Sequence, residues 1–239
     1  MNRQRLLGEN SRAWTNRANY SREGSTLDGA DGDSETMSNN LKDYEYYRTD
    51  LGVLYNADCL TIIPMLEPVD LVLTDPPYPD YHTERYGYKP ELIEHLNNFD
   101  CRQYIFWSAK VDFPLSYTAI HIWDKLTGCG SQYERIFERN GQLNFKVYRC
   151  YFINSTVAAS YSGDDFTGHP SQKPKKLIIE ILDNLKPQGI TLDLFIGSGS
   201  IPIACERLNR RWIGIEISEA YCEIAKKRIE KERSQLKLW

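Results

Sequence analysis

The sequence has no C-x-x-C pair, although it contains six cysteines, which are scattered at positions 59, 101, 129, 150, 205 and 222. Such scattering gives no disulfide framework and none of the paired ligands of a structural zinc cluster, so a reduced intracellular protein is expected. The four histidines are likewise too dispersed to suggest a metal site. We therefore expect no bound metal.

Long apolar runs are absent as well, since no stretch approaches the ~20 apolar residues that a membrane-spanning helix needs. The arginine-containing N-terminal segment lacks the apolar core of a signal peptide. The sequence also has no basic excess, because the net charge at pH 7 is −4. This balance weakly disfavours a nucleic-acid partner, and a DNA-binding protein with it needs a local basic strip. We expect a cytoplasmic protein with no membrane partner.

The 239 residues fit one domain preceded by an extension. Residues 1–46 are rich in Asn, Ser, Gly, Arg and Asp and show no apolar period, so we expect a disordered or loosely packed N-terminal extension. Its arginines suit either an arm that touches a phosphate backbone or an inert tail. Residues 47–239 are expected to form the globular domain.

Residues 69–74 form a short aliphatic run that is stopped by Asp75-Pro76-Pro77-Tyr78, which predicts a buried strand ending in a rigid turn. Asp75 can accept a hydrogen bond from a substrate amino group, and Pro76 offers its carbonyl oxygen. Pro77 has no backbone N–H to engage a neighbour, and Tyr78 can lie flat against a planar base. By itself the tetrapeptide favours an ordinary structural turn, and only its context in the chain favours a site.

A second apolar strand, near residues 191–195, contains Asp193 and leads into a glycine turn and an amphipathic helix. The small residues Gly197, Ser198 and Gly199 let a ligand approach the backbone at the start of that helix. Strand, glycine turn and helix N-terminus together predict a nucleotide-type site.

The following strand, residues 211–216, ends in Glu216, which lies 19 positions after Gly197. That spacing suits a carboxylate that binds ribose hydroxyls. Pro202 stands where a dinucleotide dehydrogenase has a third glycine, so the G-x-G-x-x-G fingerprint is broken. Strands alternating with helices predict an α/β fold with a doubly wound, mostly parallel sheet. If strands 69–74 and 191–195 are neighbours, their tips bring Asp75 beside the glycine turn.

Target recognition has little room in this chain, because strands and helices fill most of the segment between the two motifs. We expect recognition to come from residues 79–88 and 125–165. In the first loop, His82 and Arg85 are candidates for phosphate or base contacts, although a solvated loop is an equal alternative. Asn140-Gly141 predicts a tight turn that joins strands near residues 133–137 and 145–152.

Asp75-Pro76-Pro77-Tyr78 resembles the catalytic motif of amino-methylating DNA methyltransferases, and residues 193–200 resemble their S-adenosylmethionine motif. Residues 169–174 (His-Pro-Ser-Gln-Lys-Pro) are similar to that family's segment at the methionine part of the cofactor. The catalytic motif comes first, which resembles the permuted β class, and the resemblance covers roughly residues 52–235. It implies a Rossmann-like S-adenosylmethionine-dependent methyltransferase fold with an antiparallel edge.

The resemblance further implies methylation of the exocyclic N6 amine of adenine, in a base rotated out of double-stranded DNA. It makes Asp75, Pro76, Pro77 and Tyr78 catalytic. Asp58 would meet the cofactor adenine, a role compatible with a helix N-cap. The other cofactor-binding positions would be His169, Lys173 (toward the cofactor carboxylate), Asp193, Phe195, Gly197, Ser198, Gly199, Glu216 and Ile217. A restriction endonuclease partner is a further expectation, with the protein a monomer or a homodimer.

Three alternatives stay open. Methylation of the N4 amine of cytosine uses the same geometry, although the family associates a leading aspartate, here Asp75, with adenine and a leading serine with cytosine. RNA or protein-glutamine methylation is less expected, because protein methylators of this kind tend to begin the motif with asparagine. A non-catalytic nucleic-acid-binding subunit that kept the fold is the alternative from another class, and the intact motifs disfavour it.

Overall fold

The computed structural model describes residues 40–80, 88–127, 132–142, 144–153, 155–161 and 164–236. The expected N-terminal extension lies outside the described residues as far as position 39, and His82 and Arg85 lie outside them too. The strands are β1 (Glu45–Arg48), β2 (Gly52–Asn56), β3 (Leu71–Thr74), β4 (Arg102–Trp107), β5 (Ala119–Asp124), β6 (Tyr133–Arg139), β7 (Val147–Arg149), β8 (Ile190–Asp193) and β9 (Arg211–Glu216). The α-helices are α1 (Cys59–Ile62), α3 (Pro90–Glu94), α4 (Thr156–Tyr161), α5 (Lys175–Leu185), α6 (Ser200–Arg207) and α7 (Glu219–Leu236). Short 3-10 helices are η1 (Leu41–Tyr44), η2 (Ile63–Met65) and η3 (His95–Asn98).

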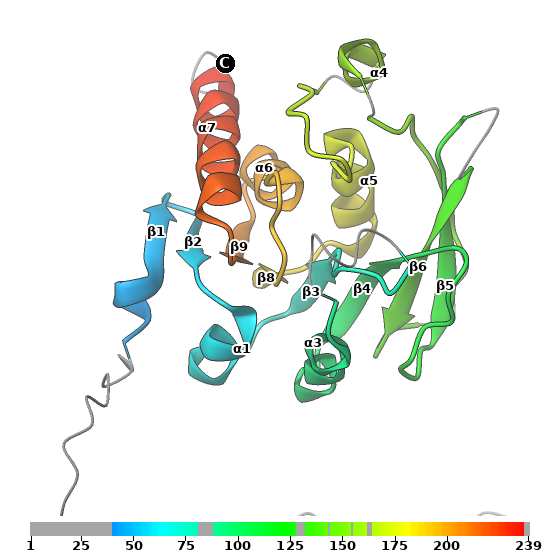
Figure 1. The fold of residues 1–239 in the computed structure, drawn as a ribbon, viewed down its shortest axis with the longest axis horizontal. Helices are drawn as coiled ribbons and strands as arrows, with labels where there is room; N and C mark the ends of the chain where they lie inside the picture. Colours follow the sequence, from blue (N-terminus) through cyan, green and yellow to red (C-terminus); the bar gives the residue numbers. More distant parts are fainter. Residues whose placement is uncertain are drawn as a thin grey trace, which may run out of the picture. The chain divides into compact units, whose positions relative to one another are not determined.

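The strands of the described part form one nine-stranded sheet in the order β1-β2-β9-β8-β3-β4-β6-β5-β7 (Figure 1). From β2 to β4 the neighbours all run parallel. Strand β6 then runs antiparallel to both β4 and β5. The predicted α/β fold, with a mostly parallel sheet and an antiparallel edge, is confirmed.

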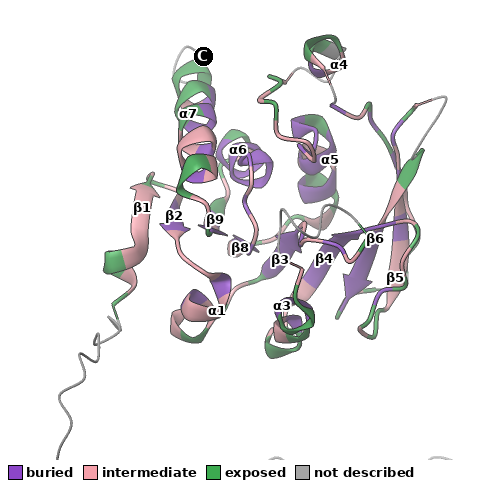
Figure 2. Ribbon diagram, viewed as in Figure 1, coloured by how far each residue is buried: buried purple, intermediate pink, exposed green. Residues whose placement is uncertain are grey.

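Helices cover both faces of the sheet, with α5, α6 and α7 on one side and α1 and α3 on the other (Figure 1). Alternation along the strands explains the two layers, because successive side chains of a strand point to opposite faces. Leu71 and Leu73 of β3 join the core beneath α5 to α7, whereas Val72 joins the core on the opposite face. The central strands are accordingly buried on both sides (Figure 2).

Strands β3 and β8 are adjacent and parallel, with Leu71 opposite Thr191 and Val72 opposite Leu192. The adjacency expected from the sequence is therefore correct. The chain leaves β3 toward β4 on one side and leaves β8 toward β9 on the other. Strand order thus reverses between β3 and β8, which is where open α/β sheets bind their ligands.

The prediction of a hairpin around Asn140-Gly141 is wrong. The chain does turn there, and Asn140 has a positive φ of 53°. However, β6 is already flanked by β4 and β5, so the following strand has no free edge of β6 to join. Strand β7 instead pairs parallel with β5 on its outer side.

At the other edge of the sheet, β1 begins at Glu45 and pairs antiparallel with β2. The first strand thus starts two residues before the boundary at residue 47 that composition suggested. No helix in the described ranges is long and apolar enough to cross a membrane.

Candidate active site

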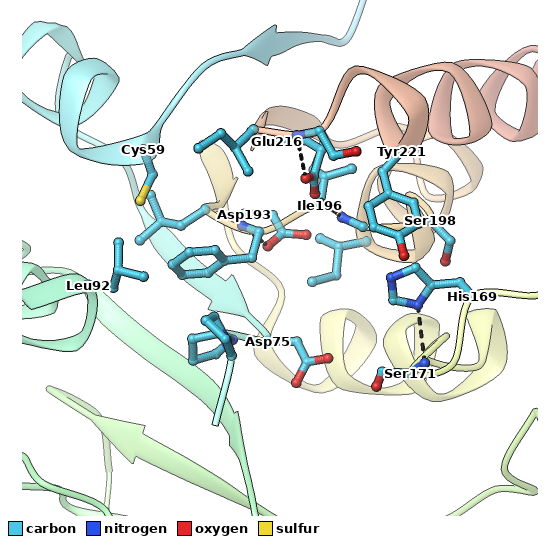
Figure 3. Close-up of a pocket in the computed structure, with 18 of the residues that line it drawn as sticks. Cys59, Asp75, Leu92, His169, Ser171, Asp193, Ile196, Ser198, Glu216 and Tyr221 are labelled. Carbon is cyan, nitrogen blue, oxygen red and sulfur yellow. Dashed lines mark hydrogen bonds between the residues drawn. The ribbon is translucent and has the colours of Figure 1, made fainter. Parts of the chain in front are cut away.

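A cavity of about 680 Å³ opens at the carboxyl ends of the central strands β2, β9, β8 and β3 (Figure 3). It brings together nearly all the site residues expected from the sequence. Those lining it are Asp58, Asp75, Pro76, Pro77, Tyr78, His169, Lys173, Asp193, Phe195, Gly197, Ser198, Glu216 and Ile217. Since these residues come from five separate stretches of the chain, the sheet rather than local sequence assembles the site.

The two glycines of the turn after β8 have different surroundings. Both have positive φ, 53° at Gly197 and 82° at Gly199. A Cβ on Gly197 would lie 3.2 Å from Nε2 of His169, a side chain that lines the cavity. A Cβ on Gly199 would lie 2.9 Å from Cβ of Ala225, on α7. Gly197 therefore keeps the cavity wall open, whereas Gly199 lies outside the cavity and allows close packing of α6 against α7.

Glu216 is held rigidly by backbone donors. Its Oε2 accepts a hydrogen bond from the Gly197 N–H at 2.8 Å, and its Oε1 accepts one from the Ser218 N–H at 2.9 Å. Burial raises the pKa of this carboxyl above its ordinary value, while the backbone donors counteract that rise. Each oxygen keeps a further lone pair, so Glu216 can still accept hydrogen bonds from a ligand.

Asp58 lies two residues beyond the end of β2, whose last residue, Asn56, pairs with Glu216 of β9. The Asp58 side chain caps α1 by accepting a hydrogen bond from the Leu60 N–H at 2.9 Å. It also lines the cavity, so the capping role and the expected ligand role are geometrically compatible.

Asp193 is buried at the end of β8, where only 2% of its surface is exposed. Its Oδ1 accepts hydrogen bonds from Thr74 Oγ1 at 3.0 Å and from the Phe195 N–H at 3.1 Å. Burial raises the pKa of Asp193 to about 7, and the nearby charges of Asp75 and Glu216 contribute to the rise. The group is thus able to change charge near neutral pH.

Asp75 is already engaged through both carboxylate oxygens. Lys173 Nζ donates to Oδ2, and the Tyr78 hydroxyl donates to Oδ1. Burial raises the pKa of Asp75, and the Lys173 ammonium opposes that rise. Burial alone would lower the pKa of Lys173, but the negative charges of Asp75 and Glu134 outweigh it and raise that pKa. Lys173 is therefore held as an ammonium ion between two carboxylates.

Lys173 and Tyr78 also make contacts that the sequence did not indicate. The Lys173 ammonium pairs with Asp75 and lines the cavity, and its expected contact with a cofactor carboxylate stays a prediction. The Tyr78 ring is 7% exposed and lies edge-on to Trp107, with 5.5 Å between ring centroids and 65° between planes. Its face does not present an open platform in this conformation, although the residue lines the cavity.

His169 closes the cavity opposite Gly197. Its Nδ1 accepts a hydrogen bond from the Ser171 N–H at 3.2 Å (Figure 3). The Tyr221 ring from α7 meets it edge-on at 4.7 Å between centroids. Ser171 and Tyr221 line the cavity without having been predicted as site residues, although Ser171 lies within the 169–174 segment singled out from the sequence.

The sequence also missed two charged residues behind Asp75, namely Lys125 and Glu134. Lys125 Nζ lies 2.6 Å from Glu134 Oε1, and Glu134 Oε2 lies 3.4 Å from Lys173 Nζ. The sequence did contain a signal for buried ion pairs, because Lys125 follows an apolar strand and Glu134 lies in one. Burying a charge there costs free energy unless the charge is paired. Their partners, however, are distant in sequence.

Ser198 and Ile217, the remaining expected residues in the lining, have different surroundings. Ser198 is buried, and its hydroxyl accepts a hydrogen bond from Arg228 of α7 at 3.1 Å. Ile217 is 70% exposed and lies at the cavity rim.

Among the described residues, no group of three or more His, Cys, Asp or Glu side chains is placed to hold a metal ion. His121, for example, is buried with its Nε2 2.8 Å from Glu138 Oε2.

Comparison with known proteins gives one family match. The N6/N4 methyltransferase model, described as DNA methylase, matches residues 100–227, which is more than half of the chain. Among curated proteins, the type II methyltransferase M.HpaI of Haemophilus parainfluenzae is 43% identical over 65 residues, 27% of this chain and 21% of that protein. M2.DpnII of Streptococcus pneumoniae is 45% identical over 65 residues, 27% of this chain and 24% of that protein. The matched segments thus span only about a fifth to a quarter of these relatives.

Solved structures show the same fold at low identity. The PvuII DNA methyltransferase, which is cytosine-N4-specific, has a TM-score of 0.58 and 16% identity, with 82% of this chain and 94% of that chain covered. The M1.HpyAVI complex with S-adenosylmethionine has a TM-score of 0.52 and 23% identity, with 74% of this chain and all of that chain covered.

Proposed function

This chain belongs to the DNA methylase family, and we propose that it transfers a methyl group from S-adenosylmethionine to the exocyclic N6 amine of adenine in DNA. The observation that carries the proposal is the meeting of Asp75 with the glycine turn at Gly197 in one cavity at the strand-order reversal. A carboxylate that can accept a hydrogen bond from an amino group and a glycine turn that can bind a nucleotide therefore face the same cavity.

The residues present fit S-adenosylmethionine. The cavity volume of about 680 Å³ falls within the usual range of small-molecule sites. Asp58 and Glu216 offer carboxylate oxygens to hydroxyl and amino groups, and Gly197 leaves the backbone accessible. Asp193 and His169 would hold the amino-acid part, with Phe195 and Ile217 covering the adenine. When bound, S-adenosylmethionine supplies a methyl group carried on a positively charged sulfur.

The chain's part in the reaction is alignment. An exocyclic amine is a poor nucleophile because its lone pair is delocalised into the ring. Hydrogen bonds from its two protons to Asp75 Oδ1 and the Pro76 carbonyl would favour a pyramidal nitrogen whose lone pair faces the methyl group. Holding the reactants in this geometry can supply about 7–11 kcal/mol of the barrier reduction.

Asp75 and Tyr78 would change partners when substrate enters. The amine N–H would replace the Tyr78 hydroxyl at Asp75 Oδ1, which frees the ring to stack on the base. Transfer would form a bond between the nitrogen and the methyl carbon as the bond between that carbon and sulfur breaks, and the nitrogen would lose one proton. Asp75, whose pKa burial raises, is a suitable acceptor for that proton. Rotating the base out of the duplex costs a few kcal/mol.

Asp75 at the head of the motif supports adenine over cytosine, following the family association of aspartate with adenine. The names of the relatives, type II methyltransferases, support double-stranded DNA as substrate, with a restriction endonuclease as a partner. That these relatives are bacterial supports a cytoplasmic location in a bacterial or phage-infected cell. We keep residues 47–239 as the catalytic domain and residues 79–88 and 125–165 as the recognition segments in this proposal.

Nucleoside mass spectrometry tests the function directly. The full chain is incubated with unmethylated plasmid DNA and S-adenosylmethionine, and the DNA is digested to nucleosides. We expect N6-methyladenine, formed by the wild type and by Asp70→Asn, a change at the opposite end of β3, but not by Asp75→Ala. N4-methylcytosine would overturn the choice of base. Neither product, with cofactor binding intact, would favour a non-catalytic nucleic-acid-binding subunit.

A further inference from the structure

Four charges of alternating sign form a line that ends at Asp75. Lys125 Nζ lies 2.6 Å from Glu134 Oε1, Glu134 Oε2 lies 3.4 Å from Lys173 Nζ, and Lys173 Nζ pairs with Asp75 Oδ2. The four side chains are between 6% and 18% exposed. Charges this deep interact more strongly than surface pairs, because little water screens them.

The two charges farthest from Asp75 in this line, Lys125 and Glu134, come from the antiparallel edge of the sheet. Lys125 follows β5 directly, and its N–H donates to the Gln132 carbonyl at 2.9 Å. Glu134 lies on β6 opposite Trp123 of β5. The edge strands therefore place these two groups by backbone pairing, far along the chain from the motif that contains Asp75.

Aromatic rings hold both ammonium groups in place. Lys125 Nζ lies 5.1 Å from the centroid of the Trp123 ring and 4.7 Å from that of Phe152. Lys173 Nζ lies 5.1 Å from the centroid of the Phe106 ring. Such cation–π contacts are attractive and restrict the position of each ammonium group.

We propose that Glu134 and Lys125 are positioning residues for methyl transfer, which hold the Lys173 ammonium between two carboxylates and so keep Asp75 available to the substrate amine. The inference rests on the function proposed above. It assigns a catalytic task to the antiparallel edge, because the shared ammonium orients Asp75 through Oδ2 without neutralising it.

Glu134 and Lys125 act on Asp75 in opposite directions. The titratable groups that face Asp75 in the described part of the chain are Lys173, Glu134, Tyr78 and Asp193. Without Glu134, Asp75 becomes the sole counter-ion of Lys173, its pKa falls, and it becomes a weaker hydrogen-bond acceptor. Without Lys125, Lys173 becomes the sole counter-ion of Glu134. Lys173 then stabilises the Asp75 carboxylate less, and the pKa of Asp75 rises.

An ordinary stabilising role predicts a different pattern. Buried ion pairs contribute little net stability, and breaking one destabilises a fold whatever its distance from the active site. Glu138 supplies the matched control, since it is a buried carboxylate on β6 that pairs with Arg102 and His121 and makes no contact with Lys173. Glu138→Gln should lower stability without changing the pH dependence of turnover.

The kinetic test compares Glu134→Gln, Lys125→Met and Glu138→Gln in the full chain, with activity expressed per folded protein. We expect Glu134→Gln to lower kcat about 10- to 100-fold with little change in KM for S-adenosylmethionine, as a displaced reactive group does. The acid limb of kcat should move to lower pH in Glu134→Gln and to higher pH in Lys125→Met. Shifts in the same direction, or none beyond the Glu138→Gln control, would overturn the proposal.

A second readout does not depend on turnover. The Asp75 carboxyl carbon is titrated by NMR in the wild type and both variants, and its resonance is assigned with Asp75→Asn. Opposite shifts of its titration support the proposal even if no methylated base is formed, an outcome that would reject the proposed function alone. Identical titrations overturn the proposal. If Glu134→Gln does not fold, Lys125→Met and its conservative counterpart Lys125→Arg, expected to restore the wild-type profile, carry both tests.

Discussion

Thr74 Oγ1 donates a hydrogen bond to Asp193 Oδ1 at 3.0 Å and accepts one from the Leu194 N–H at 3.2 Å. Thr74 is the last residue of β3, immediately before Asp75, and Asp193 is the last residue of β8. One buried hydroxyl thus joins the end of the proposed catalytic strand to the start of the glycine turn. The relative position of the two motifs depends on this contact as well as on backbone pairing.

Thr74→Val should therefore weaken both folding and cofactor binding. The change keeps the shape of the side chain but leaves Asp193 and the Leu194 N–H each without one partner, which costs about 1–3 kcal/mol. Urea unfolding measures the free energy of unfolding, and calorimetry measures the affinity for S-adenosylmethionine. Thr191→Val, an equally buried threonine change on β8, should leave the affinity near the wild-type value. An unchanged affinity in Thr74→Val would contradict the coupling.

Gly197→Ala and Gly199→Ala should separate ligand binding from stability. Both positions have positive φ, so alanine at either costs about 1–2 kcal/mol of folding free energy. Only at Gly197 does the new Cβ point toward His169 in the cavity, whereas at Gly199 it meets Ala225 of α7. We expect the larger loss of cofactor affinity in Gly197→Ala and the larger drop in melting temperature in Gly199→Ala. The reverse pattern would show that the two glycines have been assigned the wrong roles.

The two motifs were predictable because each is a contiguous run at the end of an apolar strand, and parallel neighbours align their carboxyl ends. The strand pairing at the antiparallel edge of the sheet was not predictable from the sequence. Asn140-Gly141 correctly indicates that the chain reverses, but a turn signal does not show which strand the chain then joins. Likewise, the position of Lys173 before α5 locates its backbone and leaves open which carboxylate a long, flexible side chain meets. Here that choice is made by Asp75, which follows β3, and by Glu134 of β6.

Asp193 should make stability fall as pH rises from about 4 to about 7. Burial raises its folded pKa from 3.8 to about 7, so between these values the folded state binds the proton that the unfolded state has lost. Stability therefore decreases from about pH 4 to about pH 7 and levels off above, by about 4 kcal/mol for this group.

Asp193→Asn tests this sign, because the amide has no proton to lose. The free energy of unfolding of the variant, relative to the wild type, should rise between about pH 4 and about pH 7. Urea unfolding across that range measures the difference. Asp183→Asn, an exposed change on α5, serves as the control and should show no such trend. A flat difference in Asp193→Asn would mean that Asp193 is charged throughout.

Asp75→Asn tests whether the reaction needs the negative charge of Asp75 or only its ability to accept a hydrogen bond. Asparagine can still accept one hydrogen bond from the amine, but it neither binds Lys173 as strongly nor takes up the proton. We expect single-turnover methyl transfer to fall about 10²–10³-fold, while the dissociation constant of S-adenosylmethionine stays close to that of the wild type. A large loss of cofactor affinity instead would assign Asp75 to cofactor binding.

Tyr78 should matter for its ring and little for its hydroxyl. The hydroxyl occupies Asp75 Oδ1 in this structure, where the substrate amine would bind, and the ring lies edge-on to Trp107. Tyr78→Phe therefore removes a competitor of the amine and should keep or raise kcat. Tyr78→Ala removes the stacking surface, which is worth about 1–3 kcal/mol per base.

These two variants are compared by placing 2-aminopurine at the methylated position of a short duplex, since its fluorescence rises when the base leaves the stack. We expect Tyr78→Phe to retain the fluorescence increase and Tyr78→Ala to lose most of it. Tyr117→Ala, which removes an exposed aromatic side chain on the antiparallel side of the sheet, serves as the control. If Tyr78→Phe is as defective as Tyr78→Ala, the hydroxyl itself takes part in the reaction, and its bond to Asp75 belongs to the active conformation.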